Sequence, residues 1–282
     1  MTARDAGRLV ALAAIWGASF LFMRIAAPVI GPLATADLRT LIAGLALAAY
    51  FAAIGFDAQW RRWWRHYVAV GLLTSGIPFL LYAYAALSLP AGLLAIINAT
   101  APMWGALFSV LLLGERLTRR VMAGLVTGVA GVALVTQPES DAAFALLPVL
   151  AATGACVCYG LSGAYLRRFM QDAPSRGMAV GTQLSMGIVM LPLVALAPPP
   201  AAPGALVIGC VLALGLVCGA VAYLLYFRLV TDIGVTGTLT VTYLIPIFGV
   251  LWGAMFLGEA ITPSMLAGAA LVLLGAFAVL RK

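Results

Sequence analysis

The chain has 282 residues, of which 64% are hydrophobic and 9% are charged, and its mean hydropathy is +1.11. Nearly every segment would have to lie in a core, which excludes a soluble domain of this size and predicts a protein of the lipid bilayer. The formal net charge of +7 comes from sixteen basic residues scattered in twos and threes, so it does not form the basic face of a nucleic-acid-binding protein.

Ten apolar segments approach or exceed the length of about 20 residues that crosses the hydrocarbon core. In chain order they are 9–29, 33–54, 66–87, 91–113, 119–136, 145–166, 177–196, 205–227, 235–257 and 263–280. The stretch 66–113 is too long for one crossing, and Pro90 and Gly92 predict the corner that divides it. Because none of the segments alternates apolar and polar residues, the sequence predicts an all-α integral membrane protein with ten transmembrane helices.

The basic residues predict how these spans are oriented. Fourteen of the sixteen fall in connections on one side of the membrane, counted from the N-terminus, and none falls in the connections on the other side. By the positive-inside rule both termini are cytoplasmic, in what we expect to be the inner membrane of a bacterium. The two exceptions, Arg24 and Arg39, lie inside the first and second spans, toward their outer ends.

The second half of the sequence repeats the first at an offset of 144 residues. The matched residues are Tyr82 with Tyr226, Pro102 with Pro246, Gly105 with Gly249, Gly114-Glu115 with Gly258-Glu259, Thr118 with Thr262, Gly124 with Gly268, and Gly131 with Gly275. One residue less aligns the span starts, including Arg24 with Arg167. We therefore expect two five-span repeats, 1–140 and 141–282. Because five is odd, the second enters the membrane inverted, as in secondary transporters.

Three stretches of the first repeat form an ordered set of motifs. They are "WGASFLFMR" in span one, "ADLRTLIAG" in span two and "LYAYAALSLPAGLLAIINATAPMWGALFSVLLLGERLT" across spans three to five. With its weaker second copy, this set resembles the EamA repeat of the drug/metabolite transporter (DMT) superfamily over nearly the whole chain. Within the superfamily it is most similar to the bacterial aromatic amino acid exporters of the YddG type. The resemblance implies a ten-span exporter of small metabolites with a cavity between its halves.

The acidic residues lie toward the ends of the spans, and none is at mid-membrane. Because a proton-coupled exporter of lipophilic cations normally needs a carboxylate along its path, we expect transport down the substrate's own gradient. Glu115 and Glu259 stand at two copies of a Gly-Glu-x-x-Thr corner, where each acid would lie near the positive end of the next helix. We interpret both as structural hairpin corners. No metal-ligand or phosphate-loop motif occurs, so we expect neither a metal ion nor a cofactor.

A polar residue and a proline recur at matching places in spans four and nine. Asn98 is followed four residues later by Pro102, and Thr242 by Pro246. Proline prevents one helical hydrogen bond, and transporters build substrate sites where discontinuous helices meet. Interhelical hydrogen bonds and packing kinks are the alternative interpretation. We favour a substrate site with helix breaks at both prolines, because the pairing is symmetric.

Aromatic residues within the spans form a second candidate site. Those expected to contact a substrate ring are Trp16, Phe20, Phe79, Tyr82, Tyr159, Tyr226 and Tyr243. Phe79 and Tyr82 are three residues apart on one helix face, so they can hold a planar ring between them. Packing between helices would use the same residues. The sequence also leaves open whether Tyr243 or Thr242 faces the cavity.

Arg24 and Arg39 are candidates to attract a substrate carboxylate, because a guanidinium binds carboxylates well. Snorkelling anchors, with a pairing to Asp37, are the alternative. The sequence as a whole predicts an exporter of amino acids, aromatic ones first, that works by alternating access as a monomer or weak homodimer. A broader metabolite or drug efflux transporter is the alternative within transport. A membrane sensor or intramembrane enzyme is the alternative outside it, but the sequence lacks the acid pairs and His clusters of such enzymes.

Overall fold

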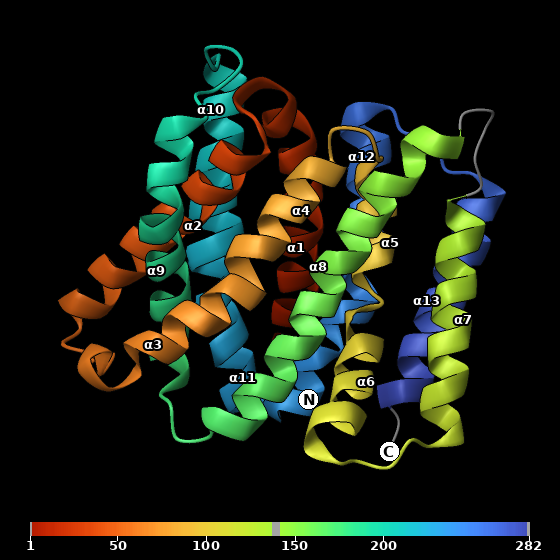
Figure 1. The fold of residues 1–282 in the computed structure, drawn as a ribbon, viewed down its shortest axis with the longest axis horizontal. Helices are drawn as coiled ribbons and strands as arrows, with labels where there is room; N and C mark the ends of the chain where they lie inside the picture. The colour runs from red at the N-terminus through yellow and green to blue at the C-terminus, as the bar shows by residue number, and fades with distance from the viewer. Residues whose placement is uncertain (1, 137–141, 281–282) are drawn as a thin grey trace.

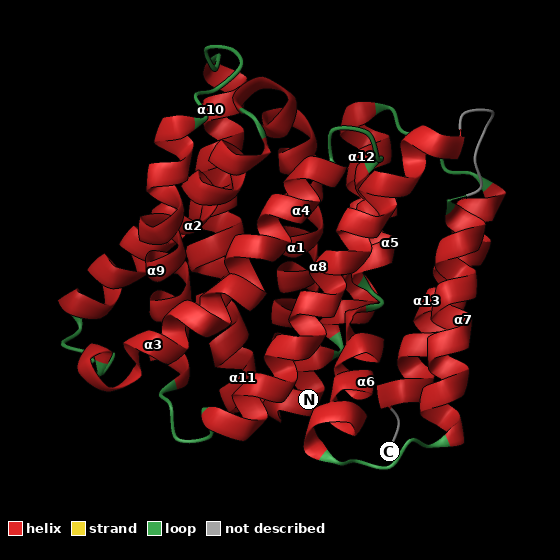
Figure 2. Ribbon diagram, viewed as in Figure 1, coloured by secondary structure: helices red, strands yellow, loops and turns green. Residues whose placement is uncertain are grey.

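The structure, a computed structural model, describes residues 2–136 and 142–280, and these form a bundle of helices (Figure 1). Its elements are α1 (Ala3–Ile30), α2 (Pro32–Ala53), α3 (Trp60–Gly71), the π-helical η1 (Leu72–Gly76), α4 (Ile77–Ala85), α5 (Ala91–Asn98), α6 (Ala101–Leu113), α7 (Arg119–Val135), α8 (Ala142–Phe169), α9 (Ser175–Leu196), α10 (Ala205–Leu212), the π-helical η2 (Ala213–Val221), α11 (Ala222–Leu239), α12 (Val241–Leu257) and α13 (Pro263–Leu280). Within the described ranges there is no strand (Figure 2).

These elements make up the ten predicted crossings. Eight helical segments of the described chain are long and apolar enough to span a membrane, and α7 and α13 complete the set. The all-α fold is thus confirmed. The main difference is at the start, where α1 begins at Ala3 because Thr2 and Asp5 form a capping box that extends the helix beyond the apolar run. The predicted boundary between repeats, at 140/141, lies outside the described residues.

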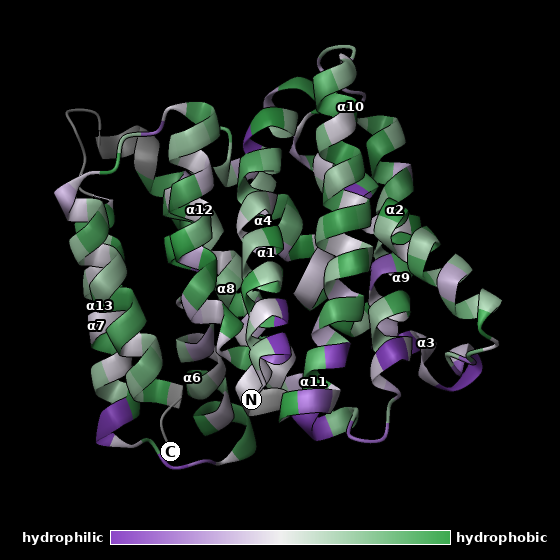
Figure 3. Ribbon diagram, turned by 180° about the vertical axis from the view of Figure 1, so that it is seen from behind, coloured by the Kyte–Doolittle hydropathy of each residue, from purple (hydrophilic) through white to green (hydrophobic). Residues whose placement is uncertain are grey.

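The two ends of the bundle differ in polarity. The N-terminus and the end of α13 lie at the same end, where Figure 3 shows the most hydrophilic segments. The arginines of this end are Arg4, Arg8, Arg61, Arg62, Arg65, Arg116, Arg119, Arg120, Arg167, Arg168, Arg176 and Arg228. We call it the arginine-rich end and the opposite one the arginine-poor end. The corner between α4 and α5 and the corner between α12 and α13 both lie at the arginine-poor end (Figure 1).

The largest buried cluster joins the two halves of the chain. It contains Leu12, Tyr82 and Leu94 from the first half, and Cys156 and Ile245 from the second. Because both repeats contribute to one core, the residues on its inner side are held in a fixed arrangement around the centre of the bundle.

Glycines allow α2 and α9 to pack backbone against backbone. A Cβ added at Gly44 would lie 2.5 Å from the Cα of Leu184. Since backbone atoms cannot give way as a flexible side chain can, Gly44→Ala is expected to destabilise the protein by about 1–3 kcal/mol, the usual cost of overpacking. Thermal unfolding of the detergent-purified protein measures this.

Gly7 is the matched control for this substitution, because a Cβ added there meets nothing within 4 Å. We expect Gly7→Ala to unfold at or slightly above the parental temperature. Equal unfolding temperatures for Gly44→Ala and the parent would contradict the packing argument.

Candidate functional site

A cavity of about 420 Å³ lies within the bundle, which is in the size range of small-molecule sites. Its walls come from α1 to α6 in the first half and from α8, α9, α11 and α12 in the second, with η1 and η2 completing them. Apolar and aromatic side chains predominate. Among the described residues that line it there is one cation, Arg39, and no acid. Such a cavity suits an apolar or aromatic molecule that carries a negative group.

The predicted substrate contacts converge on this cavity with one exception. Those that line it are Trp16, Phe20, Phe79, Tyr82, Asn98, Tyr159, Tyr226 and Thr242. Tyr243 lies elsewhere, with its ring 6.5 Å from that of Phe277 on α13. The face of α12 that carries Thr242 and Ile245 is therefore the one that faces the cavity.

The aromatic rings contact one another in two groups. Trp16 lies 5.7 Å from Tyr226, measured between ring centroids. Tyr82 lies 5.3 Å from Phe20, edge to face, and 6.3 Å from Tyr159 in a stacked arrangement. Contacts of this kind restrict the rotation of each ring. The cavity thus has fixed aromatic walls from both halves of the chain.

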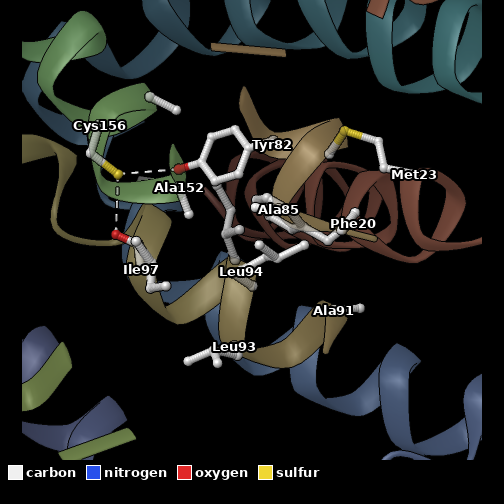
Figure 4. Close-up of a cluster of buried hydrophobic side chains, with 14 of the residues drawn as sticks. Phe20, Met23, Tyr82, Ala85, Ala91, Leu93, Leu94, Ile97, Ala152 and Cys156 are labelled. Carbon is white, nitrogen blue, oxygen red and sulfur yellow. Dashed lines mark hydrogen bonds between the residues drawn. The ribbon is translucent and has the colours of Figure 1, made fainter. Parts of the chain in front are cut away.

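Tyr82 orients the carboxamide of Asn98. Its hydroxyl donates to Asn98 Oδ1 at 3.0 Å. The same hydroxyl lies 3.1 Å from Cys156 Sγ, which in turn donates to the carbonyl oxygen of Ile97 at 3.2 Å (Figure 4). With Oδ1 occupied, Asn98 Nδ2 has no hydrogen-bond partner within the described chain. Asn98 thereby offers N–H donors at the wall of the cavity.

In the first half the helix is interrupted between Asn98 and Ala101, directly before Pro102. In the second half the matching proline, Pro246, lies inside α12, and the chain turns earlier, at Thr240. The hydroxyl of Thr242 donates to its own helix, to the carbonyl oxygen of Leu239 at 2.8 Å. The two halves therefore differ here, and the free amide donor of Asn98 has no equivalent at Thr242.

Arg39 is nearly buried, at 6% exposed, and its guanidinium lies 3.7 Å above the ring of Phe79. Nη1 has a weak contact with Met23 Sδ at 3.8 Å, and Nε has no partner in the described chain. Asp37 does not pair with it, because residues two apart on a helix point to different sides. A buried guanidinium without a carboxylate partner favours an anion brought by the substrate.

Arg24 occupies a different environment. Its Nη1 donates to the carbonyl oxygens of Ala86 and Leu87, at 2.7 and 2.9 Å, and it is not among the residues that line the cavity. Of the two arginines predicted to attract a carboxylate, the structure brings only Arg39 to the cavity.

Gln183 on α9 is a cavity residue that the sequence analysis missed. It is fully buried, and its Nε2 donates to Ser75 Oγ at 2.7 Å and to the Tyr223 hydroxyl at 3.1 Å. Ser75 belongs to η1, and π-helical turns occur often at functional sites. A carboxamide inside an apolar span is the same feature that identified Asn98, so the sequence did carry an indication of it.

Gln183→Leu is expected to lower the unfolding temperature, because it leaves the buried Ser75 hydroxyl without its amide partner. Each of the two hydrogen bonds that the amide donates contributes about 0.5–1.5 kcal/mol. Tyr223→Phe removes one partner of the amide and keeps the other, so it is the milder control. The expectation fails if the two variants unfold at the same temperature as the parent.

Comparison with known proteins agrees with this architecture. The model of the EamA-like transporter family matches residues 8–137 and again 146–281, and the model of the Triose-phosphate Transporter family matches residues 83–207. The chain is 29% identical to "Uncharacterized transporter YvbV" of Bacillus subtilis (strain 168) over 95% of this chain and 89% of that protein. It is 23% identical to a "Probable terminal-alkyne amino-acid exporter" of Streptantibioticus cattleyicolor, over 97% and 92%.

A protein of known crystal structure has the same fold, with a TM-score of 0.68 and 22% identity over 97% of this chain and 96% of that one. The two segments matched by the EamA-like model cover most of the sequence and both sides of the cavity. The protein is a membrane transporter and belongs to the EamA-like transporter family.

Proposed function

We propose that this transporter exports amino acids, aromatic ones first, by alternating access and down the substrate's gradient. The observation that carries the proposal is the cavity with aromatic walls, one cation and no acid among its described lining residues. The substrate ring lies against Trp16, Tyr82, Tyr159 and Tyr226, and its carboxylate is bound by Arg39 and by the amide of Asn98. The name of the Streptantibioticus relative, an amino-acid exporter, supports the substrate class.

The same proposal includes the orientation. The arginine-rich end faces the cytoplasm of a bacterial cell, by the positive-inside rule, and both termini lie there. A monomer or weak homodimer in the inner membrane is sufficient for export, because the described cavity is lined within one chain.

Uptake into proteoliposomes tests the proposal. Purified protein is reconstituted and given labelled phenylalanine, tyrosine and tryptophan beside a panel of other amino acids and metabolites, with protein-free liposomes as the control. We expect the aromatic amino acids to enter fastest and to compete with one another. Flux of another metabolite with no flux of the three aromatic amino acids would refute the proposal.

A further inference from the structure

The hairpin 86–92, between α4 and α5 at the arginine-poor end, is held on one side by Arg24. The guanidinium donates to the carbonyl oxygens of Ala86 and Leu87, at 2.7 and 2.9 Å. These carbonyls follow the last turn of α4, where the helix dipole is negative. A cation of α1 therefore fixes the first half of the hairpin.

Glu259 holds the other side of the same hairpin. Its two carboxylate oxygens accept from the backbone N–H groups of Ala91 and Gly92, at 2.8 and 3.2 Å. These are the first N–H groups of α5, where the helix dipole is positive. The expected position of Glu259, beside the start of α13, is thus not the one found. Thr262 alone caps α13, by accepting from the N–H of Met265 at 3.2 Å.

The residues that match Arg24 and Glu259 in the other repeat are Arg167 and Glu115. They lie at the arginine-rich end, and instead of holding a hairpin they pair with each other, at 2.9 Å between Nη1 and Oε1. Neither makes a hydrogen bond or ion pair with the described groups of residues 230–236, the segment around the kink at Gly234 in α11 that matches the hairpin 86–92. One repeat has its hairpin clamped, and the other has its clamp residues bound to each other.

The position of the cavity agrees with this difference. Its lining reaches Leu166 and Met178, each three residues from the end of a helix at the arginine-rich end, or about 4.5 Å. Toward the arginine-poor end it stops at Met23 and Phe79, about 10 Å short of the helix ends. The clamped hairpin thus lies over the closed side of the cavity.

We propose that Arg24 with Glu259, and Arg167 with Glu115, are two symmetry-related clamps that close opposite ends of the transporter in turn. When a clamp is engaged, its arginine binds the carbonyl end and its glutamate the N–H end of the hairpin. When it is released, the arginine and the glutamate neutralise each other. The inference rests on the proposed alternating access, and the structure has the arginine-poor clamp engaged.

The exposure of the released pair suits this exchange. The side chains of Arg167 and Glu115 are 51% and 53% exposed, and ion pairs so open to solvent contribute little to stability. Breaking that pair to engage the hairpin therefore costs little. A mutual pairing also avoids leaving either charge alone at the membrane surface.

Distances between spin labels test the clamps. A variant with the four native cysteines replaced by alanine, first shown to unfold at the parental temperature, carries label pairs at Ser88 and Ala260 on the arginine-poor end, or at Leu117 and Thr231 on the arginine-rich end. All four label sites are exposed. We compare Glu259→Gln and Arg24→Gln with Glu115→Gln and Arg167→Gln, and use the exposed Arg62→Gln as the matched control.

Glu259→Gln and Arg24→Gln are expected to lengthen the distance at the arginine-poor end, because each loses contacts to a charged group. The ratio of molecules open at that end to molecules closed there is expected to rise about tenfold. Glu115→Gln and Arg167→Gln are expected to shift it the opposite way, and Glu115→Gln with Glu259→Gln together to restore the parental ratio. Unchanged distances, or shifts of one sign in all four variants, would overturn the clamps. Because the readout is a distance, it stands apart from whether aromatic amino acids are the substrate.

Discussion

Replacing Arg39 with glutamine is expected to lower phenylalanine transport at subsaturating concentration by about 10- to 100-fold. A hydrogen bond to a charged group contributes about 1.5–3 kcal/mol, which corresponds to that range. We expect this loss because Arg39 is the one cation among the described lining residues and has no carboxylate partner among the described residues. Initial rates at several concentrations should show most of the change in KM, since the contact is made on binding.

Arg39→Lys is expected to transport phenylalanine at a rate between those of the parent and Arg39→Gln. A lysine keeps the charge, but it lacks the planar fork that binds a carboxylate through two hydrogen bonds and stacks on Phe79. Phenethylamine, which has the ring without the carboxylate, provides the matched substrate. The parent should prefer phenylalanine and Arg39→Gln should not.

Arg62→Gln, at the exposed arginine-rich end, controls for the loss of one positive charge. Unfolding temperatures of all variants separate binding from stability. If Arg39→Gln transports phenylalanine with the parental KM, Arg39 does not bind the carboxylate.

The helical crossings could be predicted from the sequence because the bilayer imposes a length and an apolar composition on each of them. The side chain directions were harder to predict. Tyr243 and Thr242 are neighbours on one helix, and only packing against α13 turns the first away from the cavity and the second toward it. The sequence of one span does not determine how that helix is rotated about its axis relative to the other helices.

Contacts between distant parts of the chain explain the other differences. The cap that Thr262 forms on α13 follows a local rule, which connects residues three positions apart. Glu259 binds the N–H groups of residues 91 and 92, which no rule of local spacing can indicate. Gln183 and Ser75 are similarly remote in the sequence, and no rule of local spacing pairs them.

Asn98→Leu is expected to lower phenylalanine transport about tenfold or more, and Tyr82→Phe about severalfold. Leucine removes the Nδ2 donors that we propose bind the substrate carboxylate, a contact with a charged group. Phenylalanine at position 82 keeps the ring, but it loses the hydroxyl that donates to Asn98 Oδ1. The amide is then free to rotate, and only part of its contribution is lost.

The two substitutions are expected to be non-additive, because the Tyr82 hydroxyl acts through Asn98. In an Asn98→Leu background, Tyr82→Phe should change the transport rate little, whereas independent sites would multiply their effects. Initial rates of the four proteins in proteoliposomes give this comparison. The hydroxyl also lies 3.1 Å from Cys156 Sγ, so Cys156→Ala serves as the control for its second contact. A full effect of Tyr82→Phe in both backgrounds would mean that the hydroxyl meets the substrate directly, and that Asn98 does not depend on it for its orientation.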